Sequence, residues 1–210
     1  MVQFWRPRLL WVYKKQFITV KSLTMRKVTV FNFITLNGYF QGTDGDISWH
    51  HHEADTAKYS DEKSQMGNTL LFGRVTYQQM ASFWPTAAAK QMQPVTADGM
   101  NKAEKIVFSR TLKKADWNNT QLIKEDLVTA VRRLKKEPGS DMTVLGSGSI
   151  VTQLADAGLI DAYGFMIDPI ALGEGVPVFK GMKNKLALKL TSSNVFPSGV
   201  IMVTYEPIKL

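Results

Sequence analysis

Three short segments of the sequence carry residue types that bind phosphate. They read G-R-V-T at residues 73–76, S-R-T at residues 109–111 and G-S-G-S at residues 146–149. Backbone N–H groups and hydroxyls donate hydrogen bonds to phosphate oxygens, and an arginine binds a phosphate through two parallel bonds. Each segment directly follows a short apolar run that is typical of a buried strand. Because a phosphorylated dinucleotide has a pyrophosphate and a separate ribose phosphate, three spaced anion sites predict a ligand of this class.

The third segment has the chemistry of a phosphate cradle at a strand-to-helix turn. Glycines let the backbone approach a ligand, and a serine N-cap begins a helix whose first N–H groups attract an anion. The run V-L-G-S-G-S-I-V at residues 144–151 lacks two stronger signatures, since Val151 replaces the third glycine of the dinucleotide fingerprint and the lysine of a P-loop is absent. By itself this segment fits a bare turn as well as a cradle.

Length and composition indicate one globular domain. A chain of 210 residues that is 44% hydrophobic is large enough for a single buried core. The absence of cysteine excludes disulfides, cysteine-ligated zinc and cysteine nucleophiles, and a reducing cytoplasm is the natural setting. The longest apolar runs fall far short of the roughly 18 residues of a membrane span, which predicts a soluble protein without a membrane partner.

The formal net charge of +8 is concentrated near the N-terminus. Residues 1–24 contain five basic residues and no acidic one, which leaves 21 basic and 18 acidic residues in the rest. Because a strand-like run follows Met25 at once, we predict an N-terminal extension over residues 1–24 and one domain over residues 25–210. The alternative is an additional element, such as a strand or an arm between two copies. We expect no nucleic-acid partner for the domain, and such binding would need residues 1–24.

The apolar pattern alternates between strands and helices. Strands are predicted at residues 28–34, 70–72, 105–109, 122–123, 142–145 and 162–167, and helices over residues 53–66, from about 74 to 84, from 126 to about 137 and from about 149 to 158. Residues 86–101 show no period and are predicted to form a loop, whereas residues 186–205 predict an antiparallel hairpin. The fold class is therefore α/β, a three-layer α/β/α arrangement with a mainly parallel mixed sheet. Ligands of such sheets bind at the carboxyl ends of the strands.

A set of motifs in fixed order resembles a known family. The motifs are T-L-N-G-Y-F at residues 35–40, L-F-G-R-V-T-Y at 71–77, K-I-V-F-S-R-T-L at 105–112, L-G-S-G-S-I at 145–150, L-I-D at 159–161 and P-I-A-L-G-E-G-V-P-V-F at 169–179. Together they resemble the bacterial dihydrofolate reductase-like family. The resemblance is closer to the branch similar to the C-terminal reductase domain of the bifunctional riboflavin-biosynthesis deaminase-reductase, and it covers about residues 25–207.

The resemblance implies a dihydrofolate reductase-like fold, NADPH as the cofactor, a small-molecule substrate such as a pterin or a ribosylaminopyrimidine, and a homodimer. It places the ribose phosphate near residues 73–76, the adenosine half near residues 109–110, the pyrophosphate at residues 146–150 and the nicotinamide beside the turn after Leu36. The cofactor-binding residues it implies are Gly73, Arg74, Val75, Thr76, Ser109, Arg110, Gly146, Ser147, Gly148, Ser149 and Ile150. A structural ion pair is the alternative role for Arg74.

The first motif departs from the family pattern at the position that could move a proton. Many relatives have S-L-D-G, whereas this chain has Asn37 within T-L-N-G. An amide cannot act as a general acid or base, so Asn37 is expected to orient a ligand or simply to form the turn beside Gly38. Candidate proton donors nearby in the sequence are Asp55, which we predict to be catalytic with Asn37, and Asp44, Asp46, Glu53 or water. A non-catalytic nucleotide-binding protein is the alternative function.

Two further clusters have simpler interpretations. The three histidines of the chain, at positions 50–52, suggest a metal site, but adjacent residues do not share one face of a helix or strand. We therefore predict an exposed loop rim and no metal. The basic run at residues 132–136 is expected to form a solvated helix face, with nucleic-acid contact as the alternative. Trp49 could anchor a loop or cover a ligand.

Overall fold

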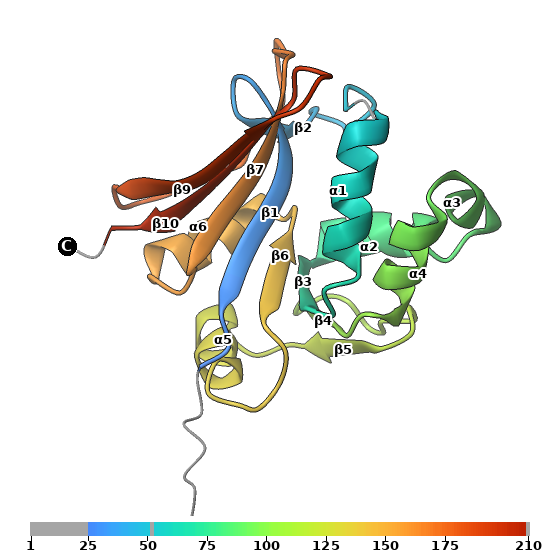
Figure 1. Ribbon diagram of the computed structural model, residues 1–210. Helices are drawn as coiled ribbons and strands as arrows, with labels where there is room; N and C mark the ends of the chain where they lie inside the picture. Colours follow the sequence, from blue (N-terminus) through green and yellow to red (C-terminus); the bar gives the residue numbers. More distant parts are fainter. Residues whose placement is uncertain (1–24, 51–52, 209–210) are drawn as a thin grey trace, which may run out of the picture.

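The computed structural model describes residues 25–50 and 53–208 and is built around one eight-stranded sheet (Figure 1). The strand order is β5-β4-β3-β6-β1-β7-β10-β9. The strands are β1 Val28–Thr35, β3 Thr69–Gly73, β4 Lys105–Phe108, β5 Thr120–Ile123, β6 Met142–Leu145, β7 Ala162–Asp168, β9 Leu188–Val195 and β10 Ile201–Pro207. The first six pair in parallel, and β10 pairs antiparallel with both β7 and β9. The predicted mixed α/β sheet and its C-terminal hairpin are confirmed.

Helices cover both faces of the sheet (Figure 1). They are α1 Ala54–Ser64, α2 Arg74–Phe83, α3 Ala87–Met92, α4 Pro94–Lys102, α5 Leu127–Leu134 and α6 Gly148–Asp156. Successive strand residues point to opposite faces, so Val28 and Val30 of β1 join the core cluster under α5 and α6. Phe31 of the same strand instead packs with Tyr59 of α1 on the other face. The result is a three-layer fold.

The segment predicted as a loop at residues 86–101 is helical, and that prediction is wrong. It forms α3 and α4, and α4 buries Thr96, Ala97, Gly99 and Met100. Small and polar residues on the buried face hide the usual apolar period. Gly99 is where α4 approaches the end of α1, since a Cβ there would lie 2.5 Å from the carbonyl oxygen of Ser64.

A second, two-stranded sheet lies beside the carboxyl end of β1. It consists of β2 Tyr39–Gln41 and β8 Val176–Pro177, which pair antiparallel. The sequence analysis missed both strands, because each has only two or three residues and no alternating pattern of its own. Their backbone hydrogen bonds join the turn after β1 to the segment that follows β7.

Candidate functional site

The three predicted anion-binding segments meet in one cleft of about 620 Å³ at the carboxyl ends of β3, β4 and β6. Ten of the predicted cofactor residues line it, namely Gly73, Arg74, Val75, Thr76, Ser109, Arg110, Ser147, Gly148, Ser149 and Ile150. Other lining residues include Phe40 and Gln41 of β2, Glu125 and Asp126 before α5, and Lys180. Parallel neighbouring strands bring their carboxyl ends together, which is why segments more than 70 residues apart in sequence share this cleft.

The turn between β6 and α6 is fixed by one side chain from β1 and one from α2. Gly146 and Ser147 both adopt left-handed backbone conformations, with φ of 58° and 57°. The Gly146 N–H donates to Asn32 Oδ1 at 2.7 Å, and the Ser147 N–H donates to Thr76 Oγ1 at 3.1 Å. These two hydrogen bonds fix the conformation of the turn.

A serine does occupy the N-cap position of α6, as predicted, but the side chain of this residue, Ser147, does not cap the helix. Its hydroxyl accepts a hydrogen bond from the Gly73 N–H at 2.8 Å, which ties the turn to the end of β3. By helix geometry the N–H groups of Gly148 and Ser149 have no acceptor within α6. Both residues line the cleft, so the end of α6 that attracts anions borders it.

Asn32 is a functional candidate that the sequence analysis missed. Its side chain is 3% exposed in the middle of β1, and its Oδ1 holds the Gly146 N–H. Its Nδ2 has no hydrogen-bond partner within the described part of the chain. A polar residue at an inward position of an otherwise apolar strand, V-T-V-F-N-F-I-T, was the signal available in the sequence.

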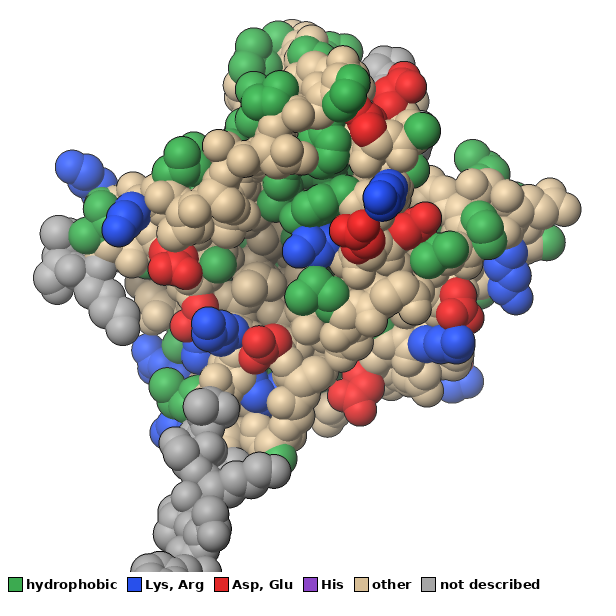
Figure 2. Space-filling view, in the orientation of Figure 1, with side chains coloured by type: hydrophobic (Ala, Val, Ile, Leu, Met, Phe, Trp, Pro, Cys, Tyr) green, Lys and Arg blue, Asp and Glu red, His purple; other side chains and the backbone are tan. Residues whose placement is uncertain are grey.

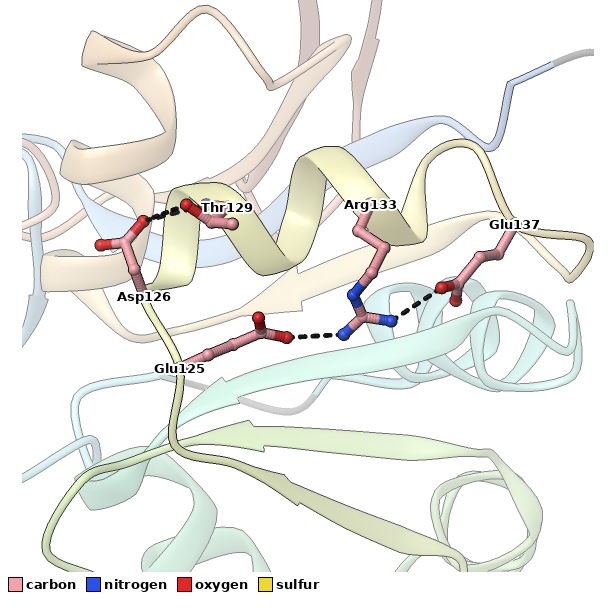
Figure 3. A network of polar contacts seen from close by, with 5 residues as sticks. All are labelled: Glu125, Asp126, Thr129, Arg133 and Glu137. Atoms are coloured by element: carbon pink, nitrogen blue, oxygen red, sulfur yellow. Dashed lines mark hydrogen bonds and ion pairs between the residues drawn. The ribbon is translucent and has the colours of Figure 1, made fainter.

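The charges of the cleft leave two arginines available to an anion. Arg74 and Arg110 are exposed, and within residues 25–50 and 53–208 neither forms an ion pair with a carboxylate. Arg74 donates to Gln78 one turn further along α2. Of the two acidic residues that line the cleft, Glu125 pairs with Arg133 and Asp126 accepts from Thr129 (Figure 3). The hydrogen bonds from Thr129 and, to a lesser extent, the charge of Arg110 lower the pKa of Asp126.

The two predicted catalytic residues do not line the cleft. Asn37 links the turn after β1 to the segment after β7, because it accepts from Thr35 Oγ1 and donates to the Leu172 carbonyl, both at 2.8 Å. Asp55 lies in the first turn of α1, and its carboxylate accepts hydrogen bonds from the N–H groups of Thr56 and Ser198 at 2.7 and 3.1 Å. Burial raises the pKa of Asp55, but these hydrogen bonds outweigh it and keep the pKa below its usual value.

A family model covers nearly all of the described residues, including those that form the cleft. The model of the RibD C-terminal domain matches residues 26–202. The chain belongs to this family. Two curated relatives come from Bacillus subtilis. The uncharacterized protein YyaP is 29% identical to this chain, and the match covers 88% of this chain and 97% of YyaP. The uncharacterized protein YwjB is 26% identical, and the match covers 83% of this chain and 95% of YwjB.

Solved structures share the fold of this RibD-type domain. A candidate riboflavin biosynthesis protein from Shewanella sp. PV-4 superposes with a TM-score of 0.68 at 22% identity, over 87% of this chain and 99% of that one. The deaminase/reductase of Thermotoga maritima and a dihydrofolate reductase of Enterococcus faecalis in complex with NADP(H) both give 0.61 at 15% identity. The match to the Thermotoga maritima enzyme covers 88% of this chain and 57% of that one, and the match to the Enterococcus faecalis enzyme covers 87% of this chain and 97% of that one. These matches confirm the dihydrofolate reductase-like fold.

The RibD-type domain also contains a buried histidine–aspartate pair that the sequence does not predict. His50 Nδ1 lies 2.9 and 3.0 Å from the two carboxylate oxygens of Asp168, at the end of β7. Asp168 is 1% exposed and His50 9%, so the predicted exposed rim is wrong for His50. The Phe33 ring lies 3.9 Å from the imidazole, and Trp49 is buried beside it, as a loop anchor would be. His51 and His52 lie outside the described residues.

Within residues 25–50 and 53–208 of this RibD-type domain, no group of three or more histidine, aspartate or glutamate side chains is placed to hold a metal ion. No helix among the described residues is long and apolar enough to cross a membrane. On the face that Figure 2 presents, basic and acidic side chains are interspersed. The predicted roles of residues 1–24 fall outside the described residues.

Proposed function

We propose that this protein is an NADPH-dependent reductase of a small heterocyclic or carbonyl substrate, of the pterin or ribosylaminopyrimidine type. Membership of the RibD C-terminal domain family supports a reductase of the riboflavin-pathway type. The observation that carries the proposal is the convergence of all three anion-binding segments on one cleft, with two arginines and the first turn of α6 at its walls.

The residues of the cleft fit the parts of NADPH. The first N–H groups of α6 suit the pyrophosphate, and Gly148 keeps that approach open, since a Cβ there would already lie 3.1 Å from the Phe40 ring. Arg74 and Arg110 suit the ribose phosphate because a guanidinium binds phosphate through a planar fork. When bound, NADPH supplies the hydride. The chain's own residues orient the cofactor, hold the substrate and exclude water.

Proton delivery is the part of the reaction for which the chain departs from its relatives. Asn37 cannot exchange a proton, and both of its polar atoms already hold the turn together. We propose that Asn37 fixes the turn beside the nicotinamide and that water or Asp55 supplies the proton. This departure also favours the second candidate, a nucleotide-binding protein of the same fold without catalysis.

Substitution of Arg74 tests the cofactor assignment. A charge-assisted hydrogen bond contributes about 1.5–3 kcal/mol, so Arg74→Ala should raise the Kd for NADPH by roughly tenfold or more and change the Kd for NADH far less. Calorimetric titration of both cofactors measures this. Arg132→Ala is the matched control, because Arg132 is an exposed arginine of α5 that does not line the cleft. Equal losses for NADPH and NADH would remove the ribose-phosphate assignment.

Turnover separates the two candidate functions. We expect the absorbance of NADPH at its reduced-nicotinamide band to fall when a pterin, ribosylaminopyrimidine or carbonyl substrate from a broad panel is added. Saturable NADPH binding without oxidation by any member of the panel would leave the non-catalytic nucleotide-binding protein as the better conclusion. An absence of NADPH binding would overturn both.

A further inference from the structure

Two acidic residues line the same cleft as Arg74 and Arg110. Glu125 and Asp126 line it together with Ser109 and Arg110, just before α5. Carboxylates at such a place oppose a phosphate by like-charge repulsion. In dinucleotide sites a free carboxylate accepts hydrogen bonds from the ribose 2′-hydroxyl and so favours NAD over NADP. The arginines and the carboxylates of this cleft therefore favour different cofactors.

Figure 3 shows that the carboxylates of Glu125 and Asp126 point to partners on α5. Glu125 Oε1 lies 2.6 Å from Arg133 Nη2. The other terminal nitrogen, Nη1, lies 2.7 Å from Glu137 Oε1, so one planar guanidinium holds two carboxylates at once. Asp126 Oδ2 accepts from the N–H and the hydroxyl of Thr129 at 2.9 and 3.0 Å and caps α5.

We infer that Arg133 is a positioning residue that sets the preference of the cleft for the phosphorylated cofactor, by holding Glu125 against α5. This inference rests on the proposed function. Arg133 itself does not line the cleft. It acts through Glu125, whose charge it neutralises and whose side chain it withdraws from both Arg110 and the ligand.

The two ion pairs of Arg133 have different consequences. Glu137 lies four residues after Arg133, just past the end of α5, and neither Glu137 nor Arg133 lines the cleft. Only the pair with Glu125 involves a residue of the cleft. Loss of Arg133 would release Glu125 to pair with Arg110 or to accept from a ribose hydroxyl. Either change weakens binding of the ribose phosphate and leaves NADH binding unchanged or stronger.

Calorimetric titration of the full-length protein with NADPH and with NADH tests the inference in four forms: the parent, Arg133→Gln, Glu137→Gln and the double variant Arg133→Gln/Glu125→Gln. Half-exposed ion pairs contribute little, so we expect Arg133→Gln to raise the Kd ratio of NADPH to NADH by about two- to fivefold. The shift should shrink at high ionic strength, since salt screens the released carboxylate. Glu137→Gln, which removes the other pair, should leave the ratio unchanged.

The double variant distinguishes positioning from a purely structural role. Glu125→Gln removes the released charge, so the double variant should recover the parent's ratio although the network is lost. An unchanged ratio in Arg133→Gln, or a double variant as impaired as the single one, would overturn the inference while NADPH binding by the parent still stood. If the parent bound neither cofactor, the proposed function and this inference would both fall.

Discussion

At the scale of single residues, a buried pair of His50 and Asp168 joins the segment before α1 to the end of β7. The two residues are 118 positions apart, and they meet because the end of β7 lies beside β1, which carries Phe33 under the imidazole. The residues of the cleft were predictable, because each segment shows its chemistry locally in glycines, hydroxyls and arginines. A buried ion pair has no such local pattern, since its residues look the same as exposed ones.

Removal of His50 should destabilise the fold strongly. Loss of one partner of a buried pair leaves a charge without compensation and costs about 3–5 kcal/mol, so His50→Leu should lower the free energy of unfolding by that order. Urea denaturation measures the change. In the double variant His50→Leu/Asp168→Leu the buried charge is gone as well, so part of the stability should return. A double variant as unstable as the sum of both single variants would show that the pair is not coupled.

At the scale of elements, α4 is a helix that the sequence pattern did not predict. Its buried positions are threonine, alanine, glycine and methionine, which give no apolar stripe, and its stability comes from tertiary contacts. Lys105 of β4, which is 1% exposed, makes one of these tertiary contacts. Its ammonium donates to the carbonyl oxygens of Met100 and Ala103 at 2.8 and 2.7 Å and so caps the end of the helix.

Lys105 should give the stability of the protein a specific dependence on pH. Burial lowers the pKa of Lys105 from 10.5 to about 8 in the folded protein. Between these two values the unfolded chain binds more protons at this position than the folded one, so the contribution of Lys105 to the free energy of unfolding rises with pH. Between pH 8 and pH 10.5, the urea midpoint of the parent should therefore rise relative to the urea midpoint of Lys105→Met. A constant difference over this range would contradict the lowered pKa.

At the scale of the whole molecule, the order of strands and helices was the most predictable feature. Alternation of short apolar runs with helical periods implies a parallel sheet with helices on both faces, and the structure has this arrangement. The second sheet of β2 and β8 could not be predicted, because long-range backbone pairing stabilises it rather than any pattern in either strand. The boundary of the domain at Met25 is still a prediction, and the contacts of Arg26 make it testable.

Arg26 binds the beginning of the domain to residues at one end of the sheet, and the cleft lies at the other end. Its N–H donates to the Lys135 carbonyl at 3.0 Å, and its buried guanidinium donates to Thr69 Oγ1 at 2.8 Å and to the Ser140 carbonyl. A chain that begins at Met25 keeps these bonds, β1 and every residue of the cleft. We therefore expect such a chain to melt at the same temperature as the full-length protein and to bind NADPH with the same Kd.

The matched control is Arg26→Met in the same shortened chain, which leaves Thr69 and Ser140 without the guanidinium. A lost charged hydrogen bond costs about 1.5–3 kcal/mol, and each kcal/mol lowers the melting temperature of a chain of this length by roughly 2–4 °C. The control should therefore melt several degrees lower while its Kd for NADPH stays the same, since Arg26 lies far from the cleft in the sheet. If removal of residues 1–24 alone lowered the melting temperature as much or weakened NADPH binding, those residues would be part of the domain, and the boundary at Met25 would be wrong.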